Sequence, residues 1–409
     1  MDLHHGQLYW RTTEPPHLDV KPVPVRDYYD VVIVGGGMSG SLCAYTLIQE
    51  GLQIAVIDSG EMGGGSTSAN TGLLQFSNDI MLHELIEQIG EENAVRFYRL
   101  CLEALDQLEE AAETIEDTGA GSSHFIRRSS LCYASTEADK AKLIKEYEAL
   151  TRHGFPVEYW DEDKLEAEFP FSKPAALITH RDAEVNPLRF NHGVMRYLLD
   201  HGADLFDHTE AKQIEDTADG IEVHTNRGVF RAGHVIVTTG YSSPPLLGNA
   251  GLDLNRSYVI VTEPIEDLSS WKENMMIWET KRPYLYLRTT VDQRIVAGGL
   301  DEDQPETPHS ETLINSRAER IRDEVQRLFP ALPIRIAYRW AAVFGESVDN
   351  LPFIGRHPYR QKLYYLLGYG GNGTVYSMLG SHILKDLISG RPNRDAEIVR
   401  LDRESMMQT

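Results

Sequence analysis

Apolar positions first form a clear element at 30–34 (Asp-Val-Val-Ile-Val), a β-branched run typical of a parallel strand that is buried on both faces. This run leads into a glycine cluster at 35–40 and then into a helical stretch at 41–50. A second apolar run at 53–57 ends at Asp58. The order of strand, turn, helix and strand predicts a βαβ unit near the start of the chain.

The rest of the chain alternates between helical and strand-like patterns. Apolar positions recur at helical spacing in four later stretches, namely 82–117, 136–153, 186–200 and 311–328. Strand-like runs occur at 221–225, 234–238, 258–262, 284–288 and 363–367. A second glycine-rich turn, at 368–374, opens a helix predicted to end near 389. The two glycine-opened helices lie near opposite ends of the chain, which predicts a nucleotide-binding domain interrupted by an inserted domain.

The first glycine cluster has the spacing of a dinucleotide fingerprint and the strand and helix that the fingerprint requires. Gly35 would permit the tight turn, Gly37 would let the backbone approach a pyrophosphate, and Gly40 would let the helix pack on the strand. Free N–H groups at the helix start favour a phosphate. Asp58 could accept hydrogen bonds from ribose hydroxyls. The motif predicts a dinucleotide site but does not distinguish FAD from NAD.

Five segments, in order, resemble the D-amino-acid oxidase-like family of flavoproteins: the Gly/Ser/Asn-rich run 63–72, then 182–187, 208–211, 235–241 and the loop 368–374. The resemblance implies FAD. It also implies non-covalent binding, because sarcosine oxidases of this family carry a cysteine that would fall near Ala342, and no cysteine follows Cys132 here. Together with the fingerprint it assigns cofactor contacts to Gly35, Gly37, Met38, Ser39, Gly40, Asp58, Ser59, Gly65, Ser66, Thr67, Asn70, Thr71, Gly72, Leu73, Ala211, Thr239, Gly240, Gly370, Gly371, Asn372, Gly373 and Thr374.

The predicted fold class is mixed α/β, with a discontinuous Rossmann-type FAD-binding domain and an inserted antiparallel-sheet substrate domain. Residues 1–28, rich in proline and polar residues, are predicted to form an extended arm. The FAD-binding domain is assigned to 29–80, 181–250 and 336–409, and the substrate domain to 81–180 and 251–335.

The segment 282–288 alternates so that Arg282, Tyr284, Tyr286 and Arg288 share one face. The pattern alone fits a half-exposed strand equally well. The resemblance favours a wall of the substrate site, because the inserted sheet of the family faces the flavin. The catalytic candidates are Tyr286 first, and then Tyr258, Tyr369 and Arg288, with Trp340 in support.

Two positions depart from the family pattern. Glycine oxidase-like members carry a carboxylate-binding arginine where this chain has Phe344. Either Arg256, Arg282 or Arg288 replaces it, or the substrate has no carboxylate there, which favours an amine over an amino acid. Sarcosine oxidase-like members carry a lysine above the flavin where this chain has Val296, so the electron acceptor is O2 or another acceptor.

The predicted reaction is oxidation of a C–N bond of a small amine or amino acid to an imine, by hydride transfer to flavin N5. Two alternatives stay open. One is an NAD-linked dehydrogenase of another fold, which would have no use for the late glycine-rich loop. The other is a flavin-binding subunit of a larger dehydrogenase that does not itself turn over substrate.

Composition narrows the range of partners. The chain has 409 residues, with 62 acidic side chains against 39 Lys and Arg and a net charge of −23, which argues against nucleic acid or an anionic membrane surface. No apolar run approaches the ~20 residues of a membrane span. Three scattered cysteines predict neither disulfides nor a metal site, and a cytoplasmic location is expected.

Overall fold

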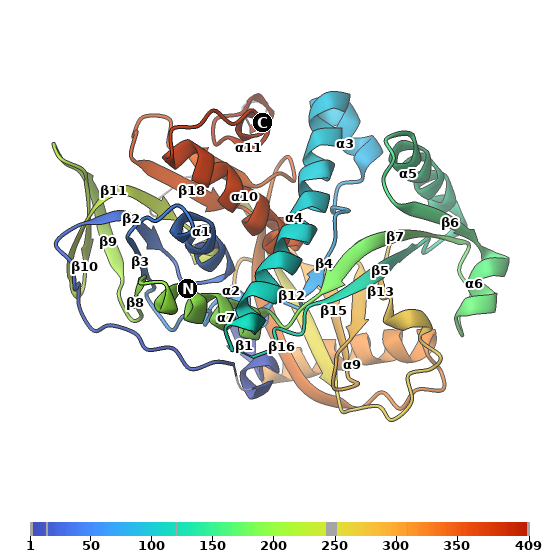
Figure 1. The fold of residues 1–409 in the computed structure, drawn as a ribbon. Coiled ribbons are helices and arrows are strands. Elements are labelled where there is room, and N and C mark those ends of the chain that lie inside the picture. The colour runs from blue at the N-terminus through green and yellow to red at the C-terminus, as the bar shows by residue number, and fades with distance from the viewer. Residues whose placement is uncertain (1–2, 14, 120, 243–251, 309, 407–409) are drawn as a thin grey trace.

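The computed structural model describes residues 3–13, 15–119, 121–242, 252–308 and 310–406. The described strands form one eight-stranded and one ten-stranded sheet, and helices pack between and around them (Figure 1). The predicted mixed α/β fold class is therefore confirmed.

The eight-stranded sheet contains the predicted βαβ unit. At its centre β2 (Tyr29–Val34) pairs in parallel with both β3 (Ile54–Ile57) and β11 (Gly228–Val237). The remaining strands are β8 (Asp204–Phe206), β9 (Ala211–Asp216), β10 (Ile221–Thr225), β17 (Phe353–Arg356) and β18 (Leu363–Leu367). The apolar residues of β2 are buried, because helices cover one face of the sheet and a second apolar cluster, which includes residues of β9 and β10, covers the other.

Two helices that begin at glycine-rich turns pack side by side on this sheet. They are α1 (Met38–Ile48) and α10 (Gly373–Ile388). Ser39 Oγ and Ser377 Oγ, one from each helix, are 2.8 Å apart and hydrogen-bonded. The two turns are more than three hundred residues apart in the chain, so this contact fixes the two ends of the sequence against each other.

The ten-stranded sheet is antiparallel except where β13 (Met276–Glu279) pairs with β5 (Ile126–Tyr133). Its other strands are β1 (His4–Gly6), β4 (Leu73–Leu74), β6 (Val157–Asp161), β7 (Ala175–Glu184), β12 (Leu252–Thr262), β14 (Leu285–Thr289), β15 (Ile295–Glu302) and β16 (Ile336–Ser347). One face packs on α9 (Glu311–Leu328) through an apolar core, and the other face contributes to the cavity described below.

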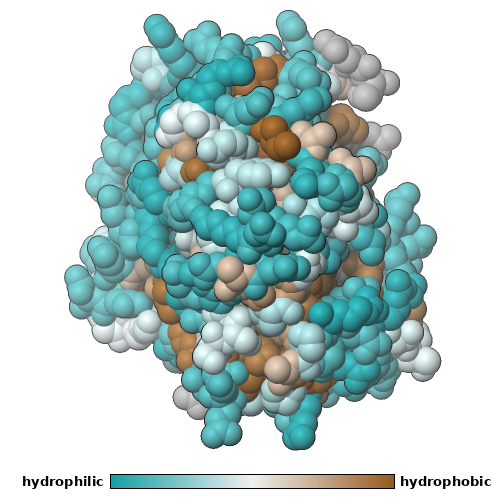
Figure 2. Space-filling model, turned by 90° about the vertical axis from the view of Figure 1, so that its right-hand side faces the viewer, coloured by the Kyte–Doolittle hydropathy of each residue, from teal (hydrophilic) through white to brown (hydrophobic). Residues whose placement is uncertain are grey.

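Further helices link the two sheets and cover the outer edge. The long α4 (Glu91–Asp117) crosses between the sheets and packs on α10 and α7 (Pro187–Asp200), with α3 (Leu82–Ile89) before it (Figure 1). At the outer edge lie α5 (Lys140–Arg152) and α6 (Glu162–Glu168), and Figure 2 shows that hydrophilic side chains cover most of this face. Two short helices are α2 (Ser66–Ala69) and α11 (Ala396–Val399).

Three segments lie differently from the predicted division into domains. Residues 336–347, assigned to the FAD-binding domain, form β16 of the ten-stranded sheet, and α4, assigned to the substrate domain, packs on α10. The predicted extended arm instead packs against the rest of the fold, because β1 pairs with β16 and Trp10 is only 2% exposed. The apolar pattern of a single segment does not show which distant element that segment will contact. The pattern could therefore not predict these domain boundaries.

No helix in the described part of the chain combines the length and apolar character that a bilayer crossing requires.

Candidate active site

One cavity of about 1020 Å³ lies where the carboxyl ends of β2, β3 and β11 meet the ten-stranded sheet. Both glycine-rich turns line it, the first through Gly35 to Ser39 and the second through Gly370 to Thr374. All of the predicted cofactor contacts except Gly40 and Gly72 line this cavity. Ligands of open α/β sheets bind at this edge of the strands, so the cavity is the candidate active site.

Gly40 and Gly72 shape the turns from outside the cavity. A Cβ on Gly40 would lie 1.8 Å from the carbonyl oxygen of Gly35, so only glycine lets the first helix sit this close to its turn. Gly72 has φ +74°, and a Cβ there would lie 2.1 Å from the carbonyl oxygen of Val185. These glycines therefore set the backbone path that the cavity-lining residues follow.

Asp58, at the end of β3, anchors the first turn as well as facing the cavity. Its Oδ2 accepts from the Gly36 N–H at 2.7 Å and its Oδ1 from the Gly60 N–H at 2.8 Å. Burial raises the pKa of this carboxyl. The predicted contact with ribose hydroxyls stays a prediction, and Ala211 lines the same end of the cavity.

The loop at 65–73 forms the second wall of this end and is held from behind by three large side chains. Arg288 Nε donates to the Thr71 carbonyl and its Nη2 to the Val185 carbonyl, both at 2.7 Å. The indole N–H groups of Trp10 and Trp340 donate to the carbonyls of Asn70 (2.6 Å) and Ala69 (3.0 Å). The loop that faces the cavity thus has its outward carbonyls satisfied by buried donors.

Three of the predicted substrate residues lie outside the cavity. Arg288 and Trp340 are buried behind the loop as just described. Tyr258 points to the opposite face of β12, where its hydroxyl donates to Glu302 at 2.8 Å. Its neighbours Ser257 and Val259 line the cavity instead, because adjacent residues of a strand face opposite sides.

The N-terminal segment contributes residues that the sequence analysis missed. Leu3, His4 and Arg11 line the cavity, and His4 Nε2 lies 2.9 Å from the Gly64 carbonyl oxygen. The apolar pair Tyr9-Trp10 in an otherwise polar stretch is the one signal in the sequence that this segment is anchored.

Aromatic side chains gather at the end of the cavity away from Asp58. Tyr286 and Tyr369, both predicted, line it, and the Tyr369 hydroxyl donates to the Leu366 carbonyl. The Tyr286 ring lies over Gly298, where a Cβ would come within 2.4 Å of its hydroxyl. The other aromatic residues lining the cavity are Tyr241, Trp278, Tyr284 and Phe344.

Three carboxylates lie at this same end. Asp79 Oδ2 accepts from the Gly371 N–H at 3.1 Å, and a Cβ on Gly370 would lie 3.9 Å from Asp79 Oδ2 and 3.8 Å from Glu346 Cγ. Burial, then the charge of Asp79, raises the pKa of Asp301 to about 6 and that of Glu346 to about 7. The aromatic and acidic residues together are called the substrate end below.

The cavity lining contains buried polar atoms whose hydrogen bonds a bound ligand would satisfy. Buried polar atoms without a hydrogen-bond partner among the described residues include five on its lining: Ser66 Oγ, Gln75 Nε2, Ser77 Oγ, Ser257 Oγ and Asp301 Oδ1. Each such atom costs about 1–3 kcal/mol unless water or a ligand satisfies it. The volume, the two glycine turns and these polar atoms fit an extended dinucleotide such as FAD.

A sheet with a parallel centre, joined across one long cavity to a mostly antiparallel sheet, is typical of dinucleotide-dependent oxidoreductases. The family model described as FAD dependent oxidoreductase (DAO) matches residues 30–387. The chain therefore belongs to the DAO family of FAD-dependent oxidoreductases, which confirms the resemblance inferred from the sequence.

Individual relatives agree with this assignment. Glycine oxidase of Bacillus licheniformis is 28% identical over 381 residues, which are 90% of this chain and 95% of that protein. Gamma-glutamylputrescine oxidoreductase of Escherichia coli is 25% identical over 385 residues, covering 89% and 84% respectively. The crystal structure of glycine oxidase from Geobacillus kaustophilus matches with a TM-score of 0.81 at 19% identity, covering 92% of this chain and 99% of that one.

Proposed function

We propose that this enzyme oxidises a CH–NH2 or CH–NH group of a small amine or amino acid to an imine. Bound FAD supplies the chemistry by accepting a hydride from the carbon, while the nitrogen loses a proton; water then hydrolyses the imine to a carbonyl compound and an amine or ammonia. One observation carries the proposal. Both glycine-rich turns line the same cavity, and the cavity continues past them into the aromatic substrate end.

The end of the cavity around the turn at 35–39, Asp58 and Ala211, here called the cofactor end, would hold FAD through backbone groups. The turn at 35–39 would receive the pyrophosphate, Asp58 the ribose, and the backbone around Ala211 the adenine. The loop at 370–374 would meet the ring system. None of the three cysteines, all of which the structure describes, lines the cavity, which supports non-covalent binding.

The chain's own side chains would position the substrate and exclude water. Tyr284 and Tyr286 present phenol groups on one wall, and Phe344 and Trp278 add apolar surface. Burial keeps the pKa of both phenols above their ordinary value, so they stay neutral hydrogen-bond donors. Orientation of this kind can lower a barrier by ~7–11 kcal/mol.

Two finer features of the proposal concern the setting of the reaction. Val296, where the family resemblance places a lysine, is fully buried beside Trp10 and Trp340. Because this position carries no lysine, the proposal leaves the electron acceptor open between O2 and another acceptor. Three buried free thiols support a reducing, cytoplasmic setting.

The direct test is anaerobic reduction of the FAD-loaded protein by a panel of amines and amino acids, followed by admission of air. We expect at least one amine to bleach the visible flavin absorbance. Re-oxidation by air would identify O2 as acceptor, and a slow or absent return would indicate another acceptor. A protein that binds FAD but is reduced by no compound would contradict the proposal and favour the non-catalytic flavin-binding subunit.

A further inference from the structure

The two ends of the cavity differ in charge. The basic side chains among its described lining residues are His4, Arg11 and Lys212, and they lie at the cofactor end together with the acidic Asp58, Glu61 and Glu210. His4 contacts Gly64, and Arg11 pairs with Glu61 at 3.4 Å. The substrate end instead holds Asp79 and Asp301 on its lining with Glu346 beside them.

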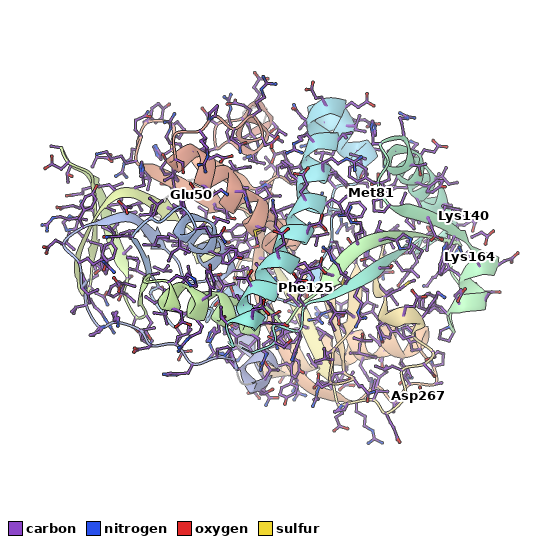
Figure 3. The ribbon with its side chains drawn as sticks, viewed as in Figure 1. Glu50, Met81, Phe125, Lys140, Lys164 and Asp267 are labelled. Carbon is purple, nitrogen blue, oxygen red and sulfur yellow. The ribbon has the colours of Figure 1, made fainter. Side chains whose placement is uncertain are left out.

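Arg282 is the cation nearest to this acidic group, and it is already engaged. Its Nη1 lies 3.6 Å from Asp79 Oδ1 and its Nη2 donates to the Asp79 carbonyl at 2.9 Å, while 53% of its side chain is exposed at the rim. Lys140 and Lys164 lie on the outer edge of the molecule (Figure 3) and pair there with Glu137 and Glu158. Arg282 is therefore one cation facing three carboxylates: it pairs with Asp79 and also lowers the pKa of Asp301 and Glu346, but burial and Asp79 still keep the pKa of both raised.

A second observation is that two buried oxygen atoms at the substrate end have no well-formed hydrogen bond to a described residue. Ser257 is only 7% exposed and lines the cavity; its hydroxyl lies near Asp301 and Tyr286 and lowers the pKa of both, but it makes no well-formed hydrogen bond to a described residue. It lies on β12 where the pairing with β15 shifts register between Arg256–Glu302 and Tyr258–Gly299. Asp301, on the facing segment, has a buried Oδ1 that also lacks a partner. An ammonium group donates three hydrogen bonds and would satisfy both oxygens.

The lack of an arginine at this end adds a third observation: among the described residues that line the cavity, the one arginine is Arg11 at the cofactor end. Phe344 lines the substrate end, and its phenyl ring cannot pair with a carboxylate. Arg256, a sequence candidate for binding a carboxylate, is bound to Glu302 at 2.5 Å and does not line the cavity. A carboxylate placed at the substrate end would meet carboxylates of the same sign and no free arginine on the described lining.

We propose, on the basis of the amine oxidation proposed above, that the acidic substrate end binds a second, non-reacting ammonium group of the substrate. The substrate is then a small diamine whose far ammonium sits between Asp79, Asp301 and Glu346, with its methylene chain along the aromatic wall. The reacting end loses a hydride and a proton to become an imine. The far end stays protonated and only binds, so the redox balance is that of the parent reaction.

Three compounds of equal chain length test this inference: butane-1,4-diamine, butylamine and 4-aminobutyrate. They differ at the far end, which is an ammonium, a methyl group or a carboxylate. With FAD-loaded enzyme under nitrogen, the apparent second-order rate constant for flavin reduction is expected to be at least ~10-fold higher for the diamine than for butylamine, and lowest for 4-aminobutyrate. Equal rates for diamine and butylamine would overturn the inference and leave amine oxidation standing.

Variants that remove one negative charge and keep the shape of the side chain test which carboxylates bind the far ammonium group. In Asp301→Asn and Asp79→Asn the ratio of the diamine rate constant to the butylamine rate constant should fall to within ~3-fold, whatever the change in either rate constant alone. Asp267→Asn, on an outer loop of the molecule (Figure 3), removes the same charge away from the cavity and should keep the preference. An unchanged preference in both cavity variants would overturn the inference.

If no compound reduces the flavin, the proposed reaction is contradicted. A binding measurement then tests the ammonium site by itself. The melting temperature of the FAD-loaded protein is then compared in equal concentrations of diamine and butylamine. A rise with the diamine alone, lost in Asp301→Asn, supports the acidic ammonium site without turnover. Equal shifts with both amines would overturn it.

Discussion

The cofactor end and the substrate end of the cavity are built by different means. The cofactor end is made largely of backbone, because the glycine-rich turns bring main-chain atoms to the cavity surface, while Gly40 and Gly72 behind them leave no room for a side chain. The substrate end is made of side chains, including Tyr286, Asp301 and Phe344, carried on separate strands. A backbone site depends on local geometry, whereas a side-chain site depends on how distant strands pair.

This difference predicts opposite sensitivities to mutation. At the cofactor end, an added methyl group or a lost backbone support should damage folding and FAD binding together. At the substrate end, isosteric changes should leave the fold and FAD binding intact and alter rate, specificity or pH dependence. Four substitutions test the comparison, from the largest expected effect to the smallest.

Arg288→Met should have the largest effect. The substitution leaves the carbonyls of Thr71 and Val185 without this donor, and it removes one of the two arginines that pair with the buried Glu184 among the described residues, leaving Arg128 at 3.0 Å. Removing one partner of a buried ion pair costs about 3–5 kcal/mol. Urea denaturation should show this loss in the free energy of unfolding. Arg335→Met, 76% exposed, is the control and should change it by less than ~0.5 kcal/mol. A loss below ~1 kcal/mol in Arg288→Met would show that the loop does not need this support.

Gly40→Ala comes next. The new Cβ would lie 1.8 Å from the Gly35 carbonyl oxygen, so the helix must move away from the turn. Overpacking of this kind costs ~1–3 kcal/mol, and FAD affinity should fall at least ~10-fold. Flavin fluorescence on release measures the affinity. Gln49→Ala, at the exposed end of the same helix, should bind FAD normally. Unchanged affinity in Gly40→Ala would contradict a pyrophosphate site at this turn.

Glu346→Gln should change the pH dependence of stability in the substrate-free protein. Burial first and then Asp79 raise the pKa of Glu346 to about 7; Asp301 and Asp253 add to this, and Arg282 opposes it. The unfolded chain loses this proton near pH 4.5, so wild-type stability falls as pH rises from there toward about 7.

The variant lacks this loss and should be more stable than wild type at pH 8 by roughly 1–3 kcal/mol, and equal to it at pH 4. Chemical denaturation at both pH values measures the difference. Glu266→Gln, on an exposed loop, should match wild type at both. Equal stability of Glu346→Gln and wild type at pH 8 would show that the substrate end is not electrostatically strained.

Tyr286→Phe should have the smallest effect on the molecule. Its ring packing over Gly298 is kept and only the phenol hydroxyl is lost. We expect anaerobic flavin reduction to slow about tenfold, which corresponds to ~1.4 kcal/mol, with FAD affinity unchanged. A loss of FAD affinity without a change in rate would place Tyr286 at the cofactor end instead.

The sequence predicted most of the residues that line the cofactor end of the cavity, because a glycine fingerprint carries its own geometry, and their contacts with FAD stay a prediction. Gly35, Asp58 and the loop at 370–374 needed only their neighbours in the chain to be recognised, and they meet in one cavity. Even Gly40 and Gly72, which do not line it, act through local backbone packing.

The substrate end was less predictable because it depends on long-range pairing. Strand alternation correctly put Arg288 on the same face as Tyr286, but the loop at 69–72 covers that face further along the strand. Tyr258 was one residue out of phase with the cavity-facing Ser257. Asp301 lies beside a register shift where Leu300 has φ +58°, and alternation does not reveal such a bulge.

The central claim is that two glycine-opened helices from opposite ends of the chain hold one FAD between them. A crystal structure of the FAD-loaded enzyme tests it most directly. The account predicts one FAD per chain, with the diphosphate at the turn 35–39 and the ring system at the loop 370–374, facing Tyr286. A ring system bound away from 370–374, or a protein that cannot be loaded with FAD, would contradict it.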